Sequence, residues 1–172
     1  RRQRQMCIRD SSNSAGKKIQ FLGKEHTVIN LEEFDFSKVK IAFFAAGSAI
    51  AEKWAPIAAE KTIVIDNSKF FRKDPEIPLI VPEVNSKELP KFKNKNIIAN
   101  ANCSVIPIVV ALKPLHDLYN VKRIVASTYQ SVSGAGKAGM DELISQTKEV
   151  LENKNVHSKN FTKQIAFNAI PH

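Results

Sequence analysis

The sequence contains few cysteines and no long apolar run. Cys7 and Cys103 are the only cysteines among its 172 residues, and neither has the Cys-x-x-Cys or Cys/His spacing of a disulfide framework or a zinc site. No apolar stretch approaches the roughly 20 residues that span a bilayer, and the arginine-rich start lacks the apolar segment of a signal peptide. We therefore expect a soluble, cytoplasmic protein without a metal site.

The charge is unbalanced, and aromatic residues are sparse. The net charge is +9 and is carried mainly by lysine, while aromatic residues make up 8% of the chain. Scattered lysines without interleaved aromatics are a weak signal for nucleic acid, and an enzyme with anionic ligands explains them equally well. We expect neither a nucleic acid nor a membrane as partner. The basic stretch 1–10 has no helix or strand period, so we interpret it as a disordered or non-native tail.

Apolar runs that alternate with helical patterns predict an α/β fold. Residues 17–29 indicate two short strands around Gly23, which is typical of a hairpin. Residues 39–46 and 62–66 are nearly all apolar, like strands covered on both faces of a parallel sheet, and a helical pattern separates them. This order is the βαβ unit of a doubly wound sheet. Residues 97–99 predict a third buried strand.

The rest of the chain predicts a loop, two helices and two strands. Four prolines between residues 70 and 90 predict an irregular loop that carries Arg72. A helix is expected directly after Cys103. Residues 121–129 predict a strand by their alternation, residues 137–153 a helix, and residues 163–167 the start of a further strand. One face of the helix at 137–153 carries Met140, Leu143, Ile144, Thr147 and Leu151.

Cys103 is a candidate nucleophile because of its place in this pattern. It follows an apolar strand and a small polar turn and stands where the next helix is expected to begin. Unpaired backbone N–H groups at a helix start carry partial positive charge and stabilise a thiolate. A cysteine by itself is more often a small buried apolar residue, so the surrounding motifs have to decide whether Cys103 is a nucleophile.

Three further features have both a functional and a structural interpretation. Residues 134–139 match the GxGxxG pattern between a predicted strand and a predicted helix, but the acidic strand end expected about 20 residues later is missing. That loop suits a nicotinamide carboxamide or an anion through its backbone amides. Arg72 is either a bidentate anion clamp or a solvated charge. Gln130 either hydrogen-bonds a reacting carbonyl group or only ends a strand.

Three motifs together carry a resemblance to a known family. They are residues 100–104, residues 111–117 and residues 127–136. They resemble bacterial aspartate-semialdehyde dehydrogenase, and the similarity extends over residues 11–172. The resemblance implies an NADP-dependent homodimeric oxidoreductase of lysine, threonine and methionine biosynthesis. Such an enzyme interconverts L-aspartate 4-semialdehyde and 4-phospho-L-aspartate with phosphate, through a cysteine acyl-thioester.

The same resemblance implies roles for particular residues. Cys103 is the expected nucleophile and Gln130 the residue that orients the substrate, while Arg72 and Asn102 belong to the phosphate and substrate site. The expected cofactor contacts are Ser14, Ala15, Gly47, Ser133 and Gly134. Asn13 stands where many members carry an arginine for the 2′-phosphate, so the choice between NADP and NAD stays open. None of the histidines is spaced to identify the general base.

The resemblance also implies a domain organisation. Residues 11–102 are expected to form a Rossmann-like NADP-binding domain that lacks its first strand-helix unit, and residues 103–172 the first part of an α/β catalytic and dimerisation domain. This interpretation predicts a chain that is incomplete at both ends and inactive alone. Two alternatives remain: an inactive fragment that acts as a binding or scaffold module, and N-acetyl-glutamyl-phosphate reductase, which the match at residues 127–136 disfavours.

Overall fold

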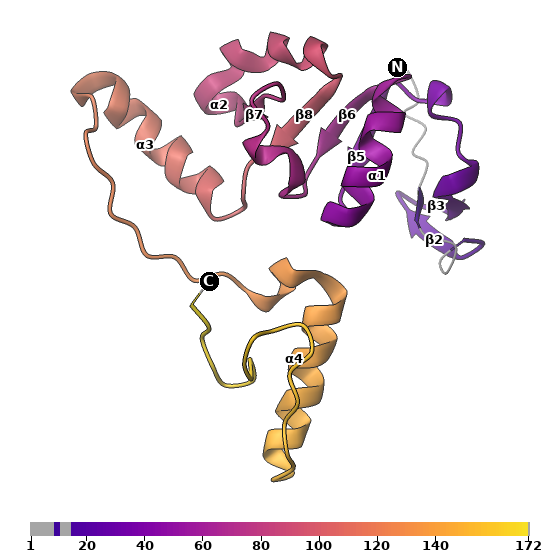
Figure 1. The fold of residues 1–172 in the computed structure, drawn as a ribbon, viewed down its shortest axis with the longest axis vertical. Helices are drawn as coiled ribbons and strands as arrows, with labels where there is room; N and C mark the ends of the chain where they lie inside the picture. Colours follow the sequence, from indigo (N-terminus) through magenta and orange to yellow (C-terminus); the bar gives the residue numbers. More distant parts are fainter. Residues whose placement is uncertain (1–8, 11–14, 172) are drawn as a thin grey trace. The chain divides into compact units, whose positions relative to one another are not determined.

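The computed structural model describes residues 9–10 and 15–171 of the chain (Figure 1). The chain divides into two compact units, Arg1–Val121 and Lys122–His172, and each is described by itself. Within the described ranges, no helix combines the length and the apolar character needed to cross a membrane. The predicted α/β architecture with a parallel sheet is confirmed.

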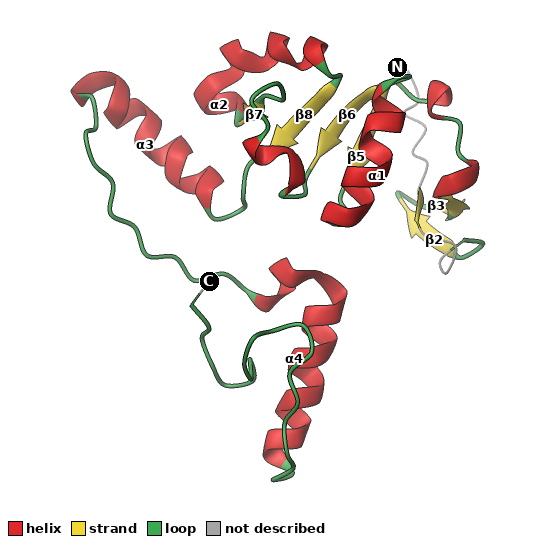
Figure 2. Cartoon of the chain, in the orientation of Figure 1, coloured by secondary structure: helices red, strands yellow, loops and turns green. Residues whose placement is uncertain are grey.

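A four-stranded parallel sheet in the order β5-β6-β8-β7 organises the first unit (Figure 2). Its strands are β5 (Ile41–Phe44), β6 (Ile63–Asp66), β8 (Ile97–Asn100) and β7 (Leu79–Ile80). Val64 in β6 pairs with Ala42 on one side and with Ile97 on the other. Its apolar side chain is buried because sheet neighbours flank it and helices cover the sheet. The three predicted strands are therefore confirmed, but β5 is not covered on both faces, since Ile41 and Phe43 on one of its faces are exposed.

Helix α1 (Ser48–Ala59) connects β5 to β6 and packs on the sheet through alanines. Ala51, Ala55 and Ala58 are buried, because their small side chains let the helix approach the strands closely. Around them lie the larger members of one apolar core: Leu31, Phe36, Phe44, Val64, Phe71, Ile77 and Ile97. Gly47 precedes α1 with a φ of +93°, a conformation that strains any residue with a side chain.

Smaller elements precede the sheet. Strands β2 (Lys18–Phe21) and β3 (Lys24–Thr27) pair antiparallel, so the predicted hairpin is confirmed. Strand β1 (Arg9–Asp10) pairs in parallel with β4 (Ile29–Asn30). These pairs are followed by the 3-10 turns η1 (Leu31–Glu33) and η2 (Phe36–Lys38). Residues 1–8 lie outside the described residues, so the interpretation of residues 1–10 as a disordered or non-native tail stays a prediction. The last two residues of that stretch, Arg9 and Asp10, form β1.

The proline-rich segment has more regular structure than an irregular loop. It contains η3 (Phe70–Lys73), β7, α2 (Pro82–Asn85) and η4 (Ser86–Asn94). Prolines lack the backbone N–H that a longer helix or central strand requires, which keeps these elements short. Helix α3 (Val105–Tyr119) then follows Cys103, as the sequence predicts.

The second unit consists of η5 (Val132–Ala135), α4 (Gly136–Leu151) and irregular segments. The helix predicted at residues 137–153 is confirmed. The strands predicted at 121–129 and 163–167 are wrong, because both segments are irregular and the described part of this unit contains no strand with which they could pair. Tyr129, at the end of the first segment, is 92% exposed.

The predicted apolar face of α4 is not the face that the unit buries. Ile144 is 56% exposed, and Met140 and Leu151 are exposed as well. The buried residues of this helix are Gly139, Glu142 and Gln146, against which residues 157–166 fold back. Hydrogen bonds from buried polar groups of the helix thus hold this segment in place.

Candidate active site

Turns at the carboxyl ends of the parallel strands hold most predicted site residues of the first unit. Strands β5, β6 and β8 end at Phe44, Asp66 and Asn100. Because the strands are parallel, these ends share one edge of the sheet, where open α/β sheets bind their ligands. Gly47 follows β5, and Cys103 follows β8.

A buried turn after β6 positions Arg72. Asp66 is fully buried, and its carboxylate accepts hydrogen bonds from the Ser68 backbone N–H at 3.0 Å and from the Ser68 hydroxyl at 2.7 Å. The Ser68 hydroxyl oxygen in turn accepts from the backbone N–H of Phe70 at 3.2 Å, at the start of η3. Phe71 anchors η3 in the apolar core. Its neighbour Arg72 is thereby fixed beside the strand ends.

The Arg72 guanidinium spans the ends of two strands. Its Nε–H donates to the backbone oxygen of Asn100 at 2.9 Å, and its Nη2–H donates to the backbone oxygen of Asn67 at 3.2 Å. Both acceptors are neutral carbonyl groups. The arrangement places an arginine, which binds phosphate or carboxylate in two-point geometry, at the edge where ligands bind.

Cys103 lies in the turn between β8 and α3, with an exposed side chain. The Asn102 side-chain oxygen accepts from the Ser104 backbone N–H at 2.9 Å, and the Asn102 backbone oxygen accepts from Val105 N–H at 3.0 Å. These bonds fold the chain from strand to helix around the cysteine. The predicted position before a helix is confirmed, while the role of the thiol stays a prediction.

The glycine-rich turn of the second unit brings Gln130 and Gly134 together. A Cβ atom placed on Gly134 would lie 2.3 Å from Nε2 of Gln130, so the Gln130 amide packs directly on the glycine backbone. The Ser131 hydroxyl oxygen accepts from the Ser133 backbone N–H at 3.3 Å and shapes the same turn. Because no strand precedes the turn, residues 134–139 lack the context of a dinucleotide fingerprint.

Two predicted cofactor contacts remain, Ala15 and Ser14. Ala15 is exposed in the turn before β2, whereas Ser14 lies outside the described residues. Sequence reasoning gave no role to Asn67, which directly follows β6, to Asn100, which ends β8, or to the buried pair Glu142 and Gln146. Their spacing of four residues on one helix face was the available signal for that last pair.

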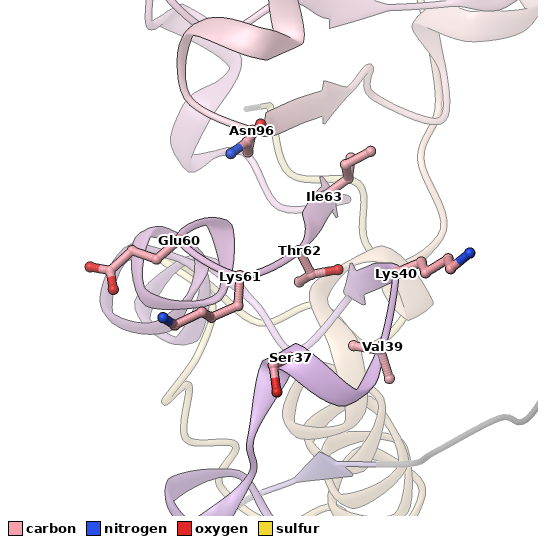
Figure 3. Close-up of a pocket in the computed structure, with 8 residues that line it drawn as sticks. All are labelled: Ser37, Val39, Lys40, Glu60, Lys61, Thr62, Ile63 and Asn96. Carbon is pink, nitrogen blue, oxygen red and sulfur yellow. The ribbon is translucent and has the colours of Figure 1, made fainter.

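Two shallow hollows lie at the opposite, amino-terminal edge of the sheet. Figure 3 shows the larger one, of about 390 Å³, lined by Ser37, Val39, Lys40, Glu60, Lys61, Thr62, Ile63 and Asn96. The smaller, of about 300 Å³, shares Glu60 and Asn96 with it. No predicted site residue lines either hollow, so the candidate site rests on the strand ends and not on these cavities.

Known families match both parts of the chain. Residues 3–92 match the semialdehyde dehydrogenase NAD binding domain, and residues 112–172 match the semialdehyde dehydrogenase dimerisation domain. The chain belongs to the semialdehyde dehydrogenase family. The predicted domain boundary after Asn102 falls between the two matched ranges, whereas the compact units divide after Val121, and that boundary stays a prediction.

Individual relatives bear the name that the motifs indicated. The chain is 54% identical over 162 residues to aspartate-semialdehyde dehydrogenase 2 of Vibrio cholerae, a match that covers 94% of this chain and 48% of the relative. It is 52% identical over 163 residues to the Rickettsia typhi enzyme of that name, with the same two coverages. The chain thus spans about half the length of these curated relatives. The predicted resemblance to aspartate-semialdehyde dehydrogenase is confirmed.

Solved structures that are similar to this chain bear the same name as these relatives. Aspartate semialdehyde dehydrogenase II of Vibrio cholerae, complexed with ASA, superposes with a TM-score of 0.89 at 52% identity, covering 96% of this chain and 50% of that one. The Candida albicans enzyme with NADP superposes with a TM-score of 0.55 at 25% identity, covering 78% and 45%.

Proposed function

We propose that this chain supplies the nucleophile and the phosphate-binding arginine of a cytoplasmic, homodimeric aspartate-semialdehyde dehydrogenase. The reaction is the phosphate-dependent interconversion of L-aspartate 4-semialdehyde and 4-phospho-L-aspartate, in the biosynthesis of lysine, threonine and methionine. One observation carries the proposal: the Arg72 guanidinium bonds to the carbonyl of Asn100, three residues before the exposed thiol of Cys103. A cation and a nucleophile that lie beside the end of the same strand suit a reaction in which the substrate gains a phosphate group.

Cys103 would act by forming a bond to carbon. Its thiolate adds to the aldehyde carbon, which gives a tetrahedral hemithioacetal on sulfur. Loss of hydride from that carbon leaves an acyl-thioester. An oxygen of inorganic phosphate then attacks the thioester carbon, the carbon–sulfur bond breaks, and the thiolate is restored as 4-phospho-L-aspartate leaves. Arg72, with Asn102 beside the thiol, would hold the phosphate, and the Gln130 amide would orient the substrate carbonyl group.

The proposed cofactor is a nicotinamide dinucleotide, and one observation supports its contact with Gly47. Gly47 has a positive φ where β5 meets α1 and no atom near its missing Cβ, so its backbone is open to a ligand. Ser133 and Gly134 would hold the nicotinamide end, while Ser14 and Ala15 would hold the adenosine end. The bound cofactor supplies the hydride acceptor. We propose NADP, in line with the resemblance and with the Candida albicans neighbour solved with NADP.

The test is the phosphate-dependent reduction of NADP by L-aspartate 4-semialdehyde, measured on the complete protein that carries these residues. Cys103→Ala should lower turnover by at least about 10³-fold, because the covalent intermediate cannot form. Cys7→Ala serves as the matched control and should keep wild-type turnover. Turnover retained by Cys103→Ala would show that the thiol mechanism is wrong.

A further inference from the structure

The Arg72 side chain, Asn67 and Asn100 form a closed ring of hydrogen bonds. Arg72 donates to the backbone oxygens of Asn100 and Asn67, and Asn100 Nδ2 donates to the side-chain oxygen Oδ1 of Asn67 at 2.7 Å. The ring thus links η3 with the ends of β6 and β8. The Asn67 backbone N–H also donates to the Phe44 oxygen at 2.8 Å, which ties the ring to β5.

We propose that Asn67 and Asn100 are positioning residues that hold the Arg72 guanidinium as an anion-binding group beside the Cys103 turn. This inference rests on the proposed function and deepens it, since it names the residues that prepare the phosphate site. Each asparagine contributes its backbone oxygen to Arg72 and its side chain to the other asparagine. The side-chain bond therefore fixes the separation of the two oxygens that Arg72 bridges.

The ring holds Arg72 without neutralising it. A guanidinium has five N–H donors, and the two bonds of the ring end on neutral carbonyl groups. Within the described ranges, every ion pair formed with a carboxylate involves a lysine and none involves Arg72. The charge and the donors outside the ring are therefore available to an oxyanion. A side chain that is already ordered loses less freedom when the anion binds.

The same ring reaches the nucleophile. Asn100 is the last residue of β8, Ala101 after it is buried, and the Asn102 side chain caps the next turn. Only this short segment separates the Asn100 carbonyl from the Cys103 side chain. Fixing Asn100 consequently fixes the arginine and the start of the cysteine turn together.

The experiment compares variants of the complete protein that carries these residues in two measurements. One is the dissociation constant of inorganic phosphate from calorimetry, and the other is the hydrogen exchange rate of the Arg72 Nε–H from nitrogen-15 NMR. Asn67→Ala and Asn100→Ala should each weaken phosphate binding about 5- to 20-fold and speed the exchange. The double variant should be no worse than either single one, because both remove the same bond.

Two further variants separate positioning from general stability. Asn85→Ala is the matched control, because Asn85 makes similar side-chain bonds outside the ring: its side-chain oxygen accepts from the Val81 N–H, and its Nδ2 donates to the backbone oxygen of Leu79 in β7. It should leave both measurements within about 2-fold of wild type. Asn67→Asp keeps an oxygen acceptor for Asn100 Nδ2, so the Arg72 Nε–H should still exchange slowly, while its added negative charge weakens phosphate binding.

The outcomes distinguish this inference from the proposed function. Phosphate affinity that is unchanged in Arg72→Ala, or absent in the wild-type protein, would overturn the anion-binding role of Arg72. If Arg72→Ala loses phosphate but Asn67→Ala and Asn100→Ala behave like Asn85→Ala, the positioning role is overturned and the proposed function stands. Unchanged Nε–H exchange in both asparagine variants would overturn the ring directly.

Discussion

The two compact units differ in the kinds of side chain that they bury. The first unit closes around an apolar core in which Phe36 and Phe44 stack with their ring centres 6.3 Å apart, and the alanines of α1 belong to the same core. In the second unit, Gln146 is 1% exposed and Glu142 is buried beside it. Apolar contacts are tolerant of direction, whereas hydrogen bonds are not. The packing of the first unit therefore depends mainly on side-chain volume, with the Asp66–Ser68 turn as a buried polar feature, whereas in the second unit directed hydrogen bonds hold the buried Ile165 and Ala166 against the helix.

Glu142 and Gln146 are satisfied mainly by the backbone of the segment that they hold. The Glu142 carboxylate accepts from the backbone N–H groups of Lys159 at 3.0 Å and Asn160 at 2.6 Å. The Gln146 side-chain oxygen accepts from Ile165 N–H at 2.8 Å, and its Nε2 donates to Glu142 at 2.9 Å. A satisfied buried network specifies one arrangement, and removing one member leaves the others without partners.

The largest effect is expected in the apolar core. Phe44→Ala should lower the free energy of unfolding of the first unit by about 3–5 kcal/mol, because it removes a buried ring and leaves a cavity. Urea denaturation followed by Trp54 fluorescence measures this change. Phe43→Ala is the matched control on the same strand, since Phe43 is 76% exposed, and should change stability by less than about 0.5 kcal/mol. Equal effects of the two variants would contradict the assigned core.

A smaller effect is expected when the polar network of the second unit is broken. Gln146→Leu keeps a similar side-chain size but leaves the N–H groups of Ile165 and Ala166 without their acceptor. It should destabilise the fold-back of residues 157–166 by about 1–3 kcal/mol. Amide hydrogen exchange at Ile165 and Ala166 measures the loss, with Ser145→Ala, an exposed position on the same helix, as the control. Unchanged protection would show that apolar contacts hold the segment.

The smallest effect is a response of the second unit to acid. Burial raises the pKa of the Glu142 carboxyl, but the N–H groups of Lys159, Asn160 and Phe161 favour the carboxylate, so the net pKa lies below its ordinary value. A lowered pKa means that the fold stabilises the ionised form. This contribution is fully present above about pH 4.3, the usual glutamate value, and is lost as the pH falls through the lowered pKa.

The rate of amide hydrogen exchange at Lys159 and Asn160, corrected for its intrinsic pH dependence, should therefore rise in acid before the exchange rate of the amides in β6 changes. Glu142→Gln is the control, because it removes the titrating group and should abolish the pH dependence at these two amides. An equal acid response in wild type and Glu142→Gln would assign the transition to another group.

The sequence predicted those elements that do not depend on distant partners. Continuous apolar runs identified β5, β6 and β8, and the turn signal at Gly23 identified the hairpin. The strands expected at 121–129 and 163–167 were wrong, because alternation describes only one strand of a pair and says nothing of a neighbour. The predicted buried face of α4 was wrong for a related reason: burial of Glu142 and Gln146 depends on backbone N–H and C=O groups 11 to 20 residues away in sequence.

The sequence by itself determined the family and the identity of the chemical groups. Cys103, Gln130 and Arg72 stand in motifs whose residue types already indicate a thiol, an amide and an anion clamp. Only the tertiary structure decided that Arg72 bridges the carbonyls of Asn67 and Asn100, because those residues lie 5 and 28 positions from it. Folding of parallel strands to a common edge creates that proximity, and no local pattern of residues encodes it.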